Sequence, residues 1–231
     1  MQAVKALVFD VFGTLVDWRS GVAREAARLL GPELDAPAFA DAWRAQYQPA
    51  MEEVRAGRLP FSKLDLLHRR NLDHVLHVLG RDEVPEAARA ELVLAWHRLD
   101  AWPEVGAALR RLRTRYLLAP CSNGHIALMA ALARRNRWHW DAILGAEIAR
   151  DYKPQPVVYR AAAAAFDLDP AQVMMVAAHS SDLAAAAAAG LRTAFVARPD
   201  EHGPGRGETR ATVPVDASAS DLAALARQLG A

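Results

Sequence analysis

The chain has 231 residues, of which 52% are hydrophobic and 24% charged, and its formal net charge is +1. This length suits one large core, or a core with a smaller insert, and the composition is ordinary for a globular protein. The near-zero net charge gives no electrostatic reason to expect nucleic acid as a partner.

Other features of the composition concern the compartment. Every apolar run is too short to span a bilayer, and no signal-peptide pattern precedes the segment VKALVFD. The single cysteine, Cys121, excludes an internal disulfide, which fits a reducing compartment. We therefore expect a cytoplasmic protein with no membrane partner.

The first predicted element is a strand over Val4–Phe9, because this short run is continuously apolar and rich in β-formers. The interval that follows is helical in pattern throughout. The helices expected in it are Val22–Leu30, Ala38–Ala56, Leu64–Leu79 and Glu86–Leu99. We predict that residues 17–102 form a helical cap inserted into a core made of residues 1–16 and 103–231.

After the cap, apolar runs and helical patterns alternate. The predicted strands are Tyr116–Cys121, Ala142–Ala146, Val173–Ala178 and Thr193–Val196. The predicted helices are Glu104–Arg113, Ile126–Arg135, Pro156–Phe166, Asp182–Ala189 and Ser220–Leu229, and Arg198–Pro214 is expected to be a polar loop. This alternation predicts an α/β core with a doubly wound parallel sheet.

Polar residues follow four of the predicted strands, where ligands of open parallel α/β sheets bind. Asp10 follows the first strand, Ser122-Asn123-Gly124 the second, Lys153 the third, and His179 to Asp182 the fourth. Each alone has a structural explanation, such as a turn, a helix entry, a surface lysine or an N-cap. Together, in register with successive strand ends, they predict a functional site.

These motifs resemble the haloacid dehalogenase superfamily. The matching segments are D-x-F-G-T-L-x-D from Asp10, S-N-G from Ser122 and Y-K-P-x-x-x-x-Y from Tyr152, together with the late Asp182. The resemblance covers nearly the whole chain, including the inserted cap, and is greatest to the L-2-haloacid dehalogenase (type II) branch. It implies hydrolysis of small 2-haloacids to 2-hydroxy acids without a metal or other cofactor, and assembly as a homodimer.

The residue two places after Asp10 separates two chemistries. Phosphatases of this superfamily carry there a second aspartate, which protonates the leaving alkoxide, whereas this chain has Phe12. A halide is a stable anion that leaves without a proton, and an apolar ring helps to exclude water. The sequence therefore favours displacement at carbon, with Asp10 as the nucleophile and an aspartyl ester as the intermediate.

The resemblance also implies roles for other residues. Lys153 is expected beside Asp10, where its charge keeps the carboxylate ionised. Thr14 and Ser122 are expected to hydrogen-bond Asp10 or the substrate carboxylate, while Arg44 suits a carboxylate or a departing halide. The residues expected to bind substrate or halide are Phe12, Thr14, Arg44, Ser122, Asn123 and Tyr159, although Tyr159 on a helix also suits packing.

The fourth motif departs from the family pattern, in which serine and asparagine hold the lysine and the aspartate in place. This chain has Ala177 and His179 there, and Ser181 replaces a bulky aromatic residue. The base that activates water is therefore Asp182 or His179, since a histidine near neutrality also accepts protons. The Ala-Ala-His triplet resembles a subgroup that includes defluorinating enzymes, which makes fluoroacetate a candidate substrate.

Two other functions fit the same fold. A Mg-dependent phosphatase would keep Asp10, Ser122, Lys153 and Asp182, but it would lack the acid at Phe12. A non-catalytic relative would explain the changes at Ala177 and His179.

Overall fold

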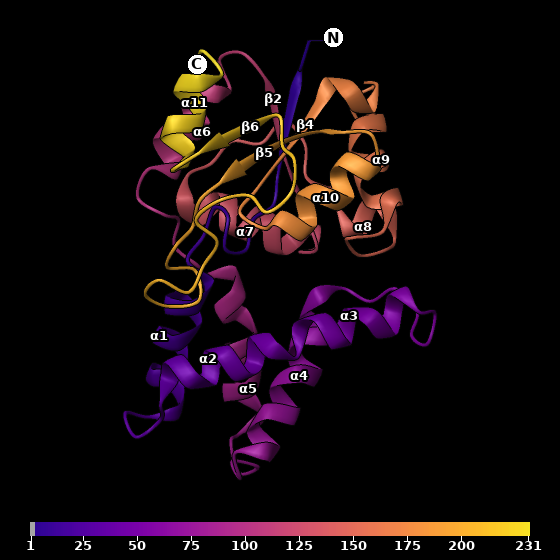
Figure 1. The fold of residues 1–231 in the computed structure, drawn as a ribbon. Coiled ribbons are helices and arrows are strands. Elements are labelled where there is room, and N and C mark those ends of the chain that lie inside the picture. The colour runs from indigo at the N-terminus through magenta and orange to yellow at the C-terminus, as the bar shows by residue number, and fades with distance from the viewer. Residues whose placement is uncertain (1–2) are drawn as a thin grey trace.

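The computed structural model describes residues 3–231. A parallel six-stranded sheet with the order β3-β2-β1-β4-β5-β6 lies in the upper part of the molecule in Figure 1. The strands are β1 (Ala6–Phe9), β2 (Leu117–Ser122), β3 (Leu144–Gly145), β4 (Val173–Ala177), β5 (Arg192–Val196) and β6 (Ala217–Ala219). β1 pairs with both β2 and β4, so Asp10 leaves the sheet at its middle. The predicted α/β fold with a doubly wound parallel sheet is confirmed.

Helices cover both faces of this sheet. They are α6 (Val105–Leu112), α7 (Ile126–Asn136), α8 (Ala146–Ala149), α9 (Pro156–Ala164), α10 (Ser180–Ala188) and α11 (Leu222–Gln228). Leu7 and Phe9 of β1 belong to one hydrophobic cluster with residues of α6, α7 and α11, whereas Ala6 and Val8 belong to another with residues of α9 and α10. Successive strand residues thus face opposite layers, which explains the continuously apolar strands.

The inserted segment is helical, as expected. Its helices are α1 (Trp18–Leu30), α2 (Ala36–Ala45), α3 (Tyr47–Arg55), α4 (Leu64–Val78) and α5 (Glu86–Val93), followed by a 3₁₀ turn at Leu94–His97. The prediction of a single helix over Ala38–Ala56 is wrong, because the helix is interrupted at Gln46, between α2 and α3. Pro49 has no N–H to donate to Ala45, so it fits the first turn of a new helix but not the interior of a long one.

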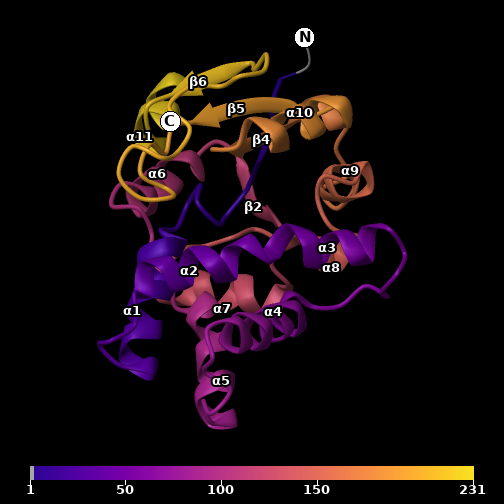
Figure 2. The same ribbon diagram turned by 60° about the horizontal axis from the view of Figure 1, so that its bottom comes forward.

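The two connections between the cap and the core run side by side. Val16 and Ala101 form an antiparallel bridge, Asp17 N donates to Asp100 O (3.0 Å) and Trp102 N donates to Leu15 O (3.1 Å). The cap helices lie beneath the sheet in Figure 1, and Figure 2 shows α2 and α3 running across this end of the core. The division into a core of residues 1–16 and 103–231 and a cap of residues 17–102 stays a prediction. The contacts described here lie at the two predicted boundaries between cap and core.

The prediction missed β6, because Ala217–Ala219 contains no run of β-formers. Its strand conformation comes from pairing with β5, in the register Ala194 to Ala217. Within residues 3–231, no helix combines the length and the hydrophobicity needed to cross a membrane.

Candidate active site

A cavity of about 590 Å³ lies between the carboxyl ends of the strands and the cap. The predicted site residues that line it are Asp10, Phe12, Arg44, Asn123, Lys153, Tyr159, His179 and Asp182. Another cavity, of about 510 Å³ beside α6 and β2, contains none of the predicted residues. The structure therefore gathers most of the predicted side chains around one hollow.

The Asp10 carboxylate contacts three polar side chains of the site. Its Oδ1 accepts a hydrogen bond from Lys153 Nζ at 2.9 Å, and its Oδ2 accepts one from Thr14 Oγ1 at 2.7 Å. His179 Nδ1 lies 3.2 Å from the same Oδ2. Burial alone would raise the pKa of Asp10, but Lys153 and His179 together lower this pKa well below its usual range. Asp10 is thus ionised at neutral pH although it is buried.

Lys153 lies between two carboxylates. Besides Asp10, its Nζ donates to Asp182 Oδ2 at 2.5 Å, and its backbone N–H donates to Asn123 Oδ1 at 2.8 Å. Burial disfavours the ammonium form, but Asp10 and Asp182 raise the pKa of Lys153 well above its usual value. The lysine therefore supplies a permanent positive charge to the centre of the site.

Both oxygens of Asp182 accept hydrogen bonds. Oδ2 accepts from Lys153, and Oδ1 accepts from the hydroxyl of Tyr159. Burial, together with the neighbouring Asp182, raises the pKa of Tyr159 above its ordinary value, so the phenol stays protonated as a donor. The N-cap explanation of Asp182 is wrong, because His179 occupies the N-cap position of α10 and Asp182 lies in its first turn.

The hydroxyl of Thr14 contacts Asp10, whereas the hydroxyl of Ser122 contacts its own turn. Thr14 Oγ1 donates to Asp10 and accepts from Ala178 N–H at 2.9 Å, which ties the ends of β1 and β4 together. Ser122 Oγ accepts from Gly124 N–H at 3.0 Å. In the described part of the chain we find no hydrogen bond from Ser122 to Asp10, because the serine hydroxyl lies within its own turn, as serine side chains commonly do.

Arg44 brings a cation from the cap to the cavity. Its guanidinium carbon lies 4.0 Å from the ring centroid of Tyr47, 5.3 Å from that of Trp18 and 6.0 Å from that of Phe12. Its buried Nη1 has no hydrogen-bond partner among residues 3–231. A buried cationic donor without a partner, surrounded by aromatic rings, suits a small anion.

Phe12 forms part of an aromatic wall. Its ring meets the ring of Tyr47 edge-on at 6.4 Å between centroids, and that of Trp96 at 5.8 Å. The side chain is almost fully buried and lines the cavity with Asp10. An apolar wall opposite an ionised carboxylate keeps water away from the face where a substrate carbon would lie.

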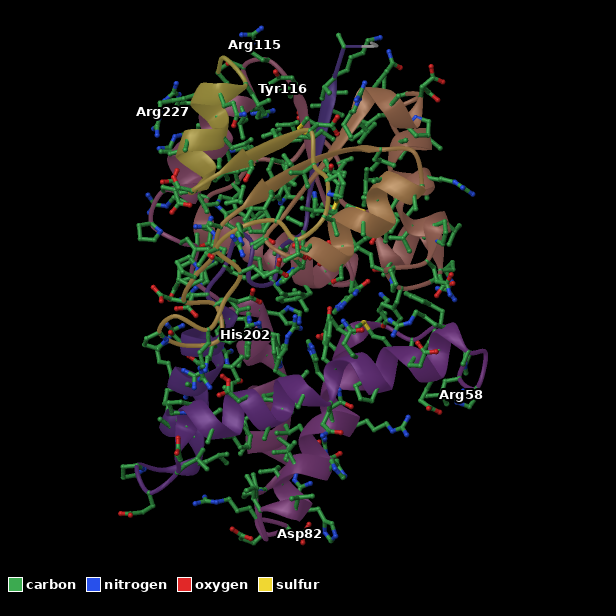
Figure 3. The ribbon with its side chains drawn as sticks, viewed as in Figure 1. Arg58, Asp82, Arg115, Tyr116, His202 and Arg227 are labelled. Atoms are coloured by element: carbon green, nitrogen blue, oxygen red, sulfur yellow. The ribbon has the colours of Figure 1, made fainter. Side chains whose placement is uncertain are left out.

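Glu201 is a site residue that the sequence analysis missed, as it also missed Tyr47. It is 2% exposed, its Oε2 lies 2.8 Å from His179 Nε2, and its Oε1 accepts a hydrogen bond from Trp18 Nε1 at 3.1 Å. Partial burial disfavours the charged form of His179, but hydrogen bonds with Asp10 and Glu201 raise the pKa of this histidine to about 10. Figure 3 labels the neighbouring His202 where the core and the cap meet.

The only sequence signal for Glu201 is indirect and lies at Gly13. This glycine has φ +86°, and a Cβ on it would lie 2.1 Å from Glu201 Oε1. The glycine after Phe12 therefore leaves the volume that the Glu201 carboxylate fills.

A cluster of three potential metal ligands lies outside the cavity. Asp65, His97 and His125 place one ligand atom each within 4.8 Å of one another. His97 Nε2 lies 2.9 Å and His125 Nε2 lies 3.4 Å from the Asp65 carboxylate. His97 thus hydrogen-bonds Asp65 and His125 lies within ion-pair distance of it, and we assign no ion to these residues.

Comparisons with known proteins find similar chains. A family model described as haloacid dehalogenase-like hydrolase matches residues 4–190. The (S)-2-haloacid dehalogenase of Pseudomonas sp. (strain YL) is 30% identical over 203 residues, which cover 86% of this chain and 84% of that protein. The crystal structure of the defluorinating L-2-haloacid dehalogenase Rha0230 is 45% identical, with a TM-score of 0.94, and the match covers 99% of this chain and 96% of that one.

A further solved structure is relevant because of what it holds. It is an L-2-haloacid dehalogenase from Xanthobacter autotrophicus with chloropropionic acid covalently bound. That chain is 26% identical to this one, with a TM-score of 0.85 and coverage of 98% of both chains.

Proposed function

Since the chain belongs to the haloacid dehalogenase-like hydrolases, as its motifs predicted, we propose that it hydrolyses small 2-haloacids to 2-hydroxy acids through an ester on Asp10. The observation that carries this proposal is the ionised Asp10 carboxylate beside Phe12 in the cavity. An unprotonated carboxylate is a nucleophile, and no second acid stands two residues later to protonate an alkoxide. A halide needs no such proton.

In the first step, an oxygen of Asp10 attacks the halogen-bearing carbon from the side opposite the halogen. The carbon–oxygen bond forms as the carbon–halogen bond breaks, and the halide leaves with the bonding electrons. Arg44 holds the substrate carboxylate or the departing halide through its unpaired N–H. Because the attack is from the back, a chiral substrate is inverted.

In the second step, water adds to the carbonyl carbon of the Asp10 ester. The bond between that carbon and the ester oxygen, which came from Asp10, then breaks, which releases the 2-hydroxy acid and restores the carboxylate. The hydroxyl oxygen of the product therefore comes from Asp10, and the oxygen of water enters the side chain. Asp182 and His179 are the two candidates for the base of this step.

Halide release from a small panel of substrates tests the proposal. We expect chloride from 2-chloropropionate and chloroacetate in EDTA, and slower fluoride release from fluoroacetate because its carbon–halogen bond is the stronger one. The fluoroacetate expectation is supported by the 45% identity to a structure described as defluorinating. Ion chromatography or halide electrodes provide the measurement.

A parallel assay with p-nitrophenyl phosphate completes the test, and two results of the combined assays would contradict the proposal. Turnover of p-nitrophenyl phosphate that requires Mg²⁺, without halide release, would indicate the phosphatase. No activity in either assay would indicate the non-catalytic relative.

Replacing Arg44 tests its contact with the substrate. We expect Arg44→Lys to raise KM for chloroacetate by roughly 10-fold or more, because lysine cannot reproduce the planar arginine fork. Arg58→Lys is the matched control, since Arg58 is exposed and pairs with Glu53 at the far end of α3 (Figure 3). Unchanged steady-state kinetics in Arg44→Lys would exclude Arg44 from substrate binding.

The small-molecule substrate is the partner that the similar dehalogenases support. Assembly as a homodimer and location in the cytoplasm, which the resemblance implies, stay predictions.

A further inference from the structure

The two candidate bases are bound differently in the free protein. Both carboxylate oxygens of Asp182 accept hydrogen bonds, from Lys153 and from Tyr159. His179 instead lies between two carboxylates, with Nδ1 towards Asp10 and Nε2 towards Glu201. We propose that His179 is the base that activates water for ester hydrolysis and that Glu201 positions it. This inference rests on the aspartyl ester of the proposed function.

The carboxylate of Glu201 is fixed in place by several independent contacts. Trp18 Nε1 donates to its Oε1, and the absent side chain of Gly13 makes room for it. The start of its loop is held by Arg198, whose Nε donates to Thr14 O at 2.8 Å and whose Nη2 pairs with Glu104 at 2.7 Å. A buried carboxylate held in this way selects one orientation and one tautomer of the histidine ring.

In the free protein His179 cannot act as a base. Both ring nitrogens face carboxylates, and these contacts raise the pKa of His179 to about 10 against the effect of burial, so the ring is protonated at neutral pH. In this form it helps Lys153 to stabilise the Asp10 anion. His179 therefore assists the first step as a cation.

Formation of the ester changes the charges around this ring. The charged groups that face it are Asp10 and Glu201, with Lys153 behind Asp10 and His202 beside Glu201. When Asp10 becomes an uncharged ester, Nδ1 loses its anionic partner while the positive charge of Lys153 remains. The pKa of His179 then falls, and the proton of Nδ1 passes to solvent, to which the side chain is partly exposed.

The neutral ring that results is oriented for the second step. Nε2–H stays bound to Glu201, so the lone pair is on Nδ1, which lies 3.2 Å from Asp10 Oδ2 in the free protein. A water molecule that attacks the ester carbonyl gives its proton to Nδ1, and His179 passes this proton to the departing alkoxide oxygen.

The protons balance over one catalytic cycle. The attack leaves Asp10 as a carboxylic acid, and its proton returns to His179 to restore the starting charges. The proton that His179 released after alkylation is the one acid equivalent of the whole reaction. His179 thus becomes a base only when an ester is present.

Transient kinetics with chloroacetate as the probe tests this inference. In Glu201→Gln and His179→Gln we expect a burst of about one chloride per active site, followed by slow turnover, with the alkylated chain visible in the intact mass. General-base catalysis contributes roughly 10²- to 10⁴-fold, so His179→Gln should slow ester hydrolysis by that factor and Glu201→Gln by about 10-fold or more. Glu83→Gln, at an exposed position, is the matched control and should behave as the wild type.

A pH profile separates positioning from a merely structural role. Hydrolysis of the preformed ester should rise with pH as His179 loses its proton. Because the Glu201 carboxylate raises the pKa of His179, the midpoint should move to lower pH in Glu201→Gln. An unchanged midpoint would overturn the role of Glu201. If Glu201→Gln does not fold, the chloride burst is measured in His179→Gln instead.

Two other outcomes would overturn the inference in different ways. Accumulation of the ester in Asp182→Asn, but not in His179→Gln, would make Asp182 the base and leave the proposed function intact. Absence of both chloride release and alkylated chain in the wild type would overturn the proposed function and this inference together.

Discussion

Asp10→Asn will abolish release of halide from chloroacetate, with a loss of roughly 10⁴-fold or more, as expected when a covalent nucleophile is removed. The carboxamide has no negative charge with which to attack carbon, although it fits the same space between Lys153 and Thr14. Asp82→Asn, at an exposed position in the cap (Figure 3), is the matched control and should keep full activity. Halide release and the melting temperature of both variants provide the measurement.

An isotope experiment locates the bond that the same residue makes. In one turnover of excess enzyme in ¹⁸O water, the heavy oxygen should enter the peptide that contains Asp10 and be absent from the 2-hydroxy acid. Heavy oxygen in the product alone would show that water attacks the substrate directly. Full activity of Asp10→Asn would lead to the same conclusion.

Lys153→Met will lower both activity and stability. The change leaves two buried carboxylates, Asp10 and Asp182, without the ammonium that separates them. Breaking a buried ion pair by removing one partner costs about 3–5 kcal/mol of unfolding free energy. We expect kcat/KM for chloroacetate to fall by roughly 10³-fold or more, because neutralisation of Asp10 by a proton then competes with attack on carbon.

The pH dependence of this variant gives a second signature. In the wild type, Lys153 and His179 lower the pKa of Asp10 well below its usual range, so Asp10 stays ionised throughout mild acid. Because this pKa is lower in the folded protein than in the unfolded chain, ionised Asp10 adds to the free energy of unfolding at every pH above the pKa of unfolded aspartate. This contribution is lost only as the pH falls towards the pKa of Asp10 in the folded protein. Without Lys153, burial raises the pKa of Asp10, and the acid limb of kcat/KM should move towards neutral pH.

Lys5→Met is the control for this change, because Lys5 is exposed and precedes β1 at the end remote from the cavity. Its kinetics and melting temperature should match those of the wild type. An acid limb that does not move in Lys153→Met would contradict the assignment of Lys153 as the main cation beside Asp10.

The parts of the fold that were predicted correctly are those with strong local patterns. The apolar run of β1 is long enough to identify a strand covered on both faces, and its position fixes Asp10 at the carboxyl edge of the sheet. Because successive parallel strands end at that edge, Lys153 and Asp182 could be expected near Asp10 from the sequence.

Other features depend on the tertiary structure and left no such pattern. β6 forms because β5 offers an unpaired edge, and no preference of Ala217–Ala219 announces it. Glu201 belongs to a polar loop in which any acidic residue suits solvent, and only the folded chain places its carboxylate over Gly13. The direction of the Ser122 hydroxyl follows from its own turn, which a motif cannot specify.

The paired connections at Val16 and Ala101 have an evolutionary consequence. Since the inserted helices leave and rejoin the sheet at one point, their replacement or remodelling disturbs no strand order. Changes at Arg44 and Tyr47, which line the cavity from the cap, would therefore leave Asp10 and Lys153 in place on the core. A change of substrate range through the cap would therefore keep the same nucleophile and the same lysine.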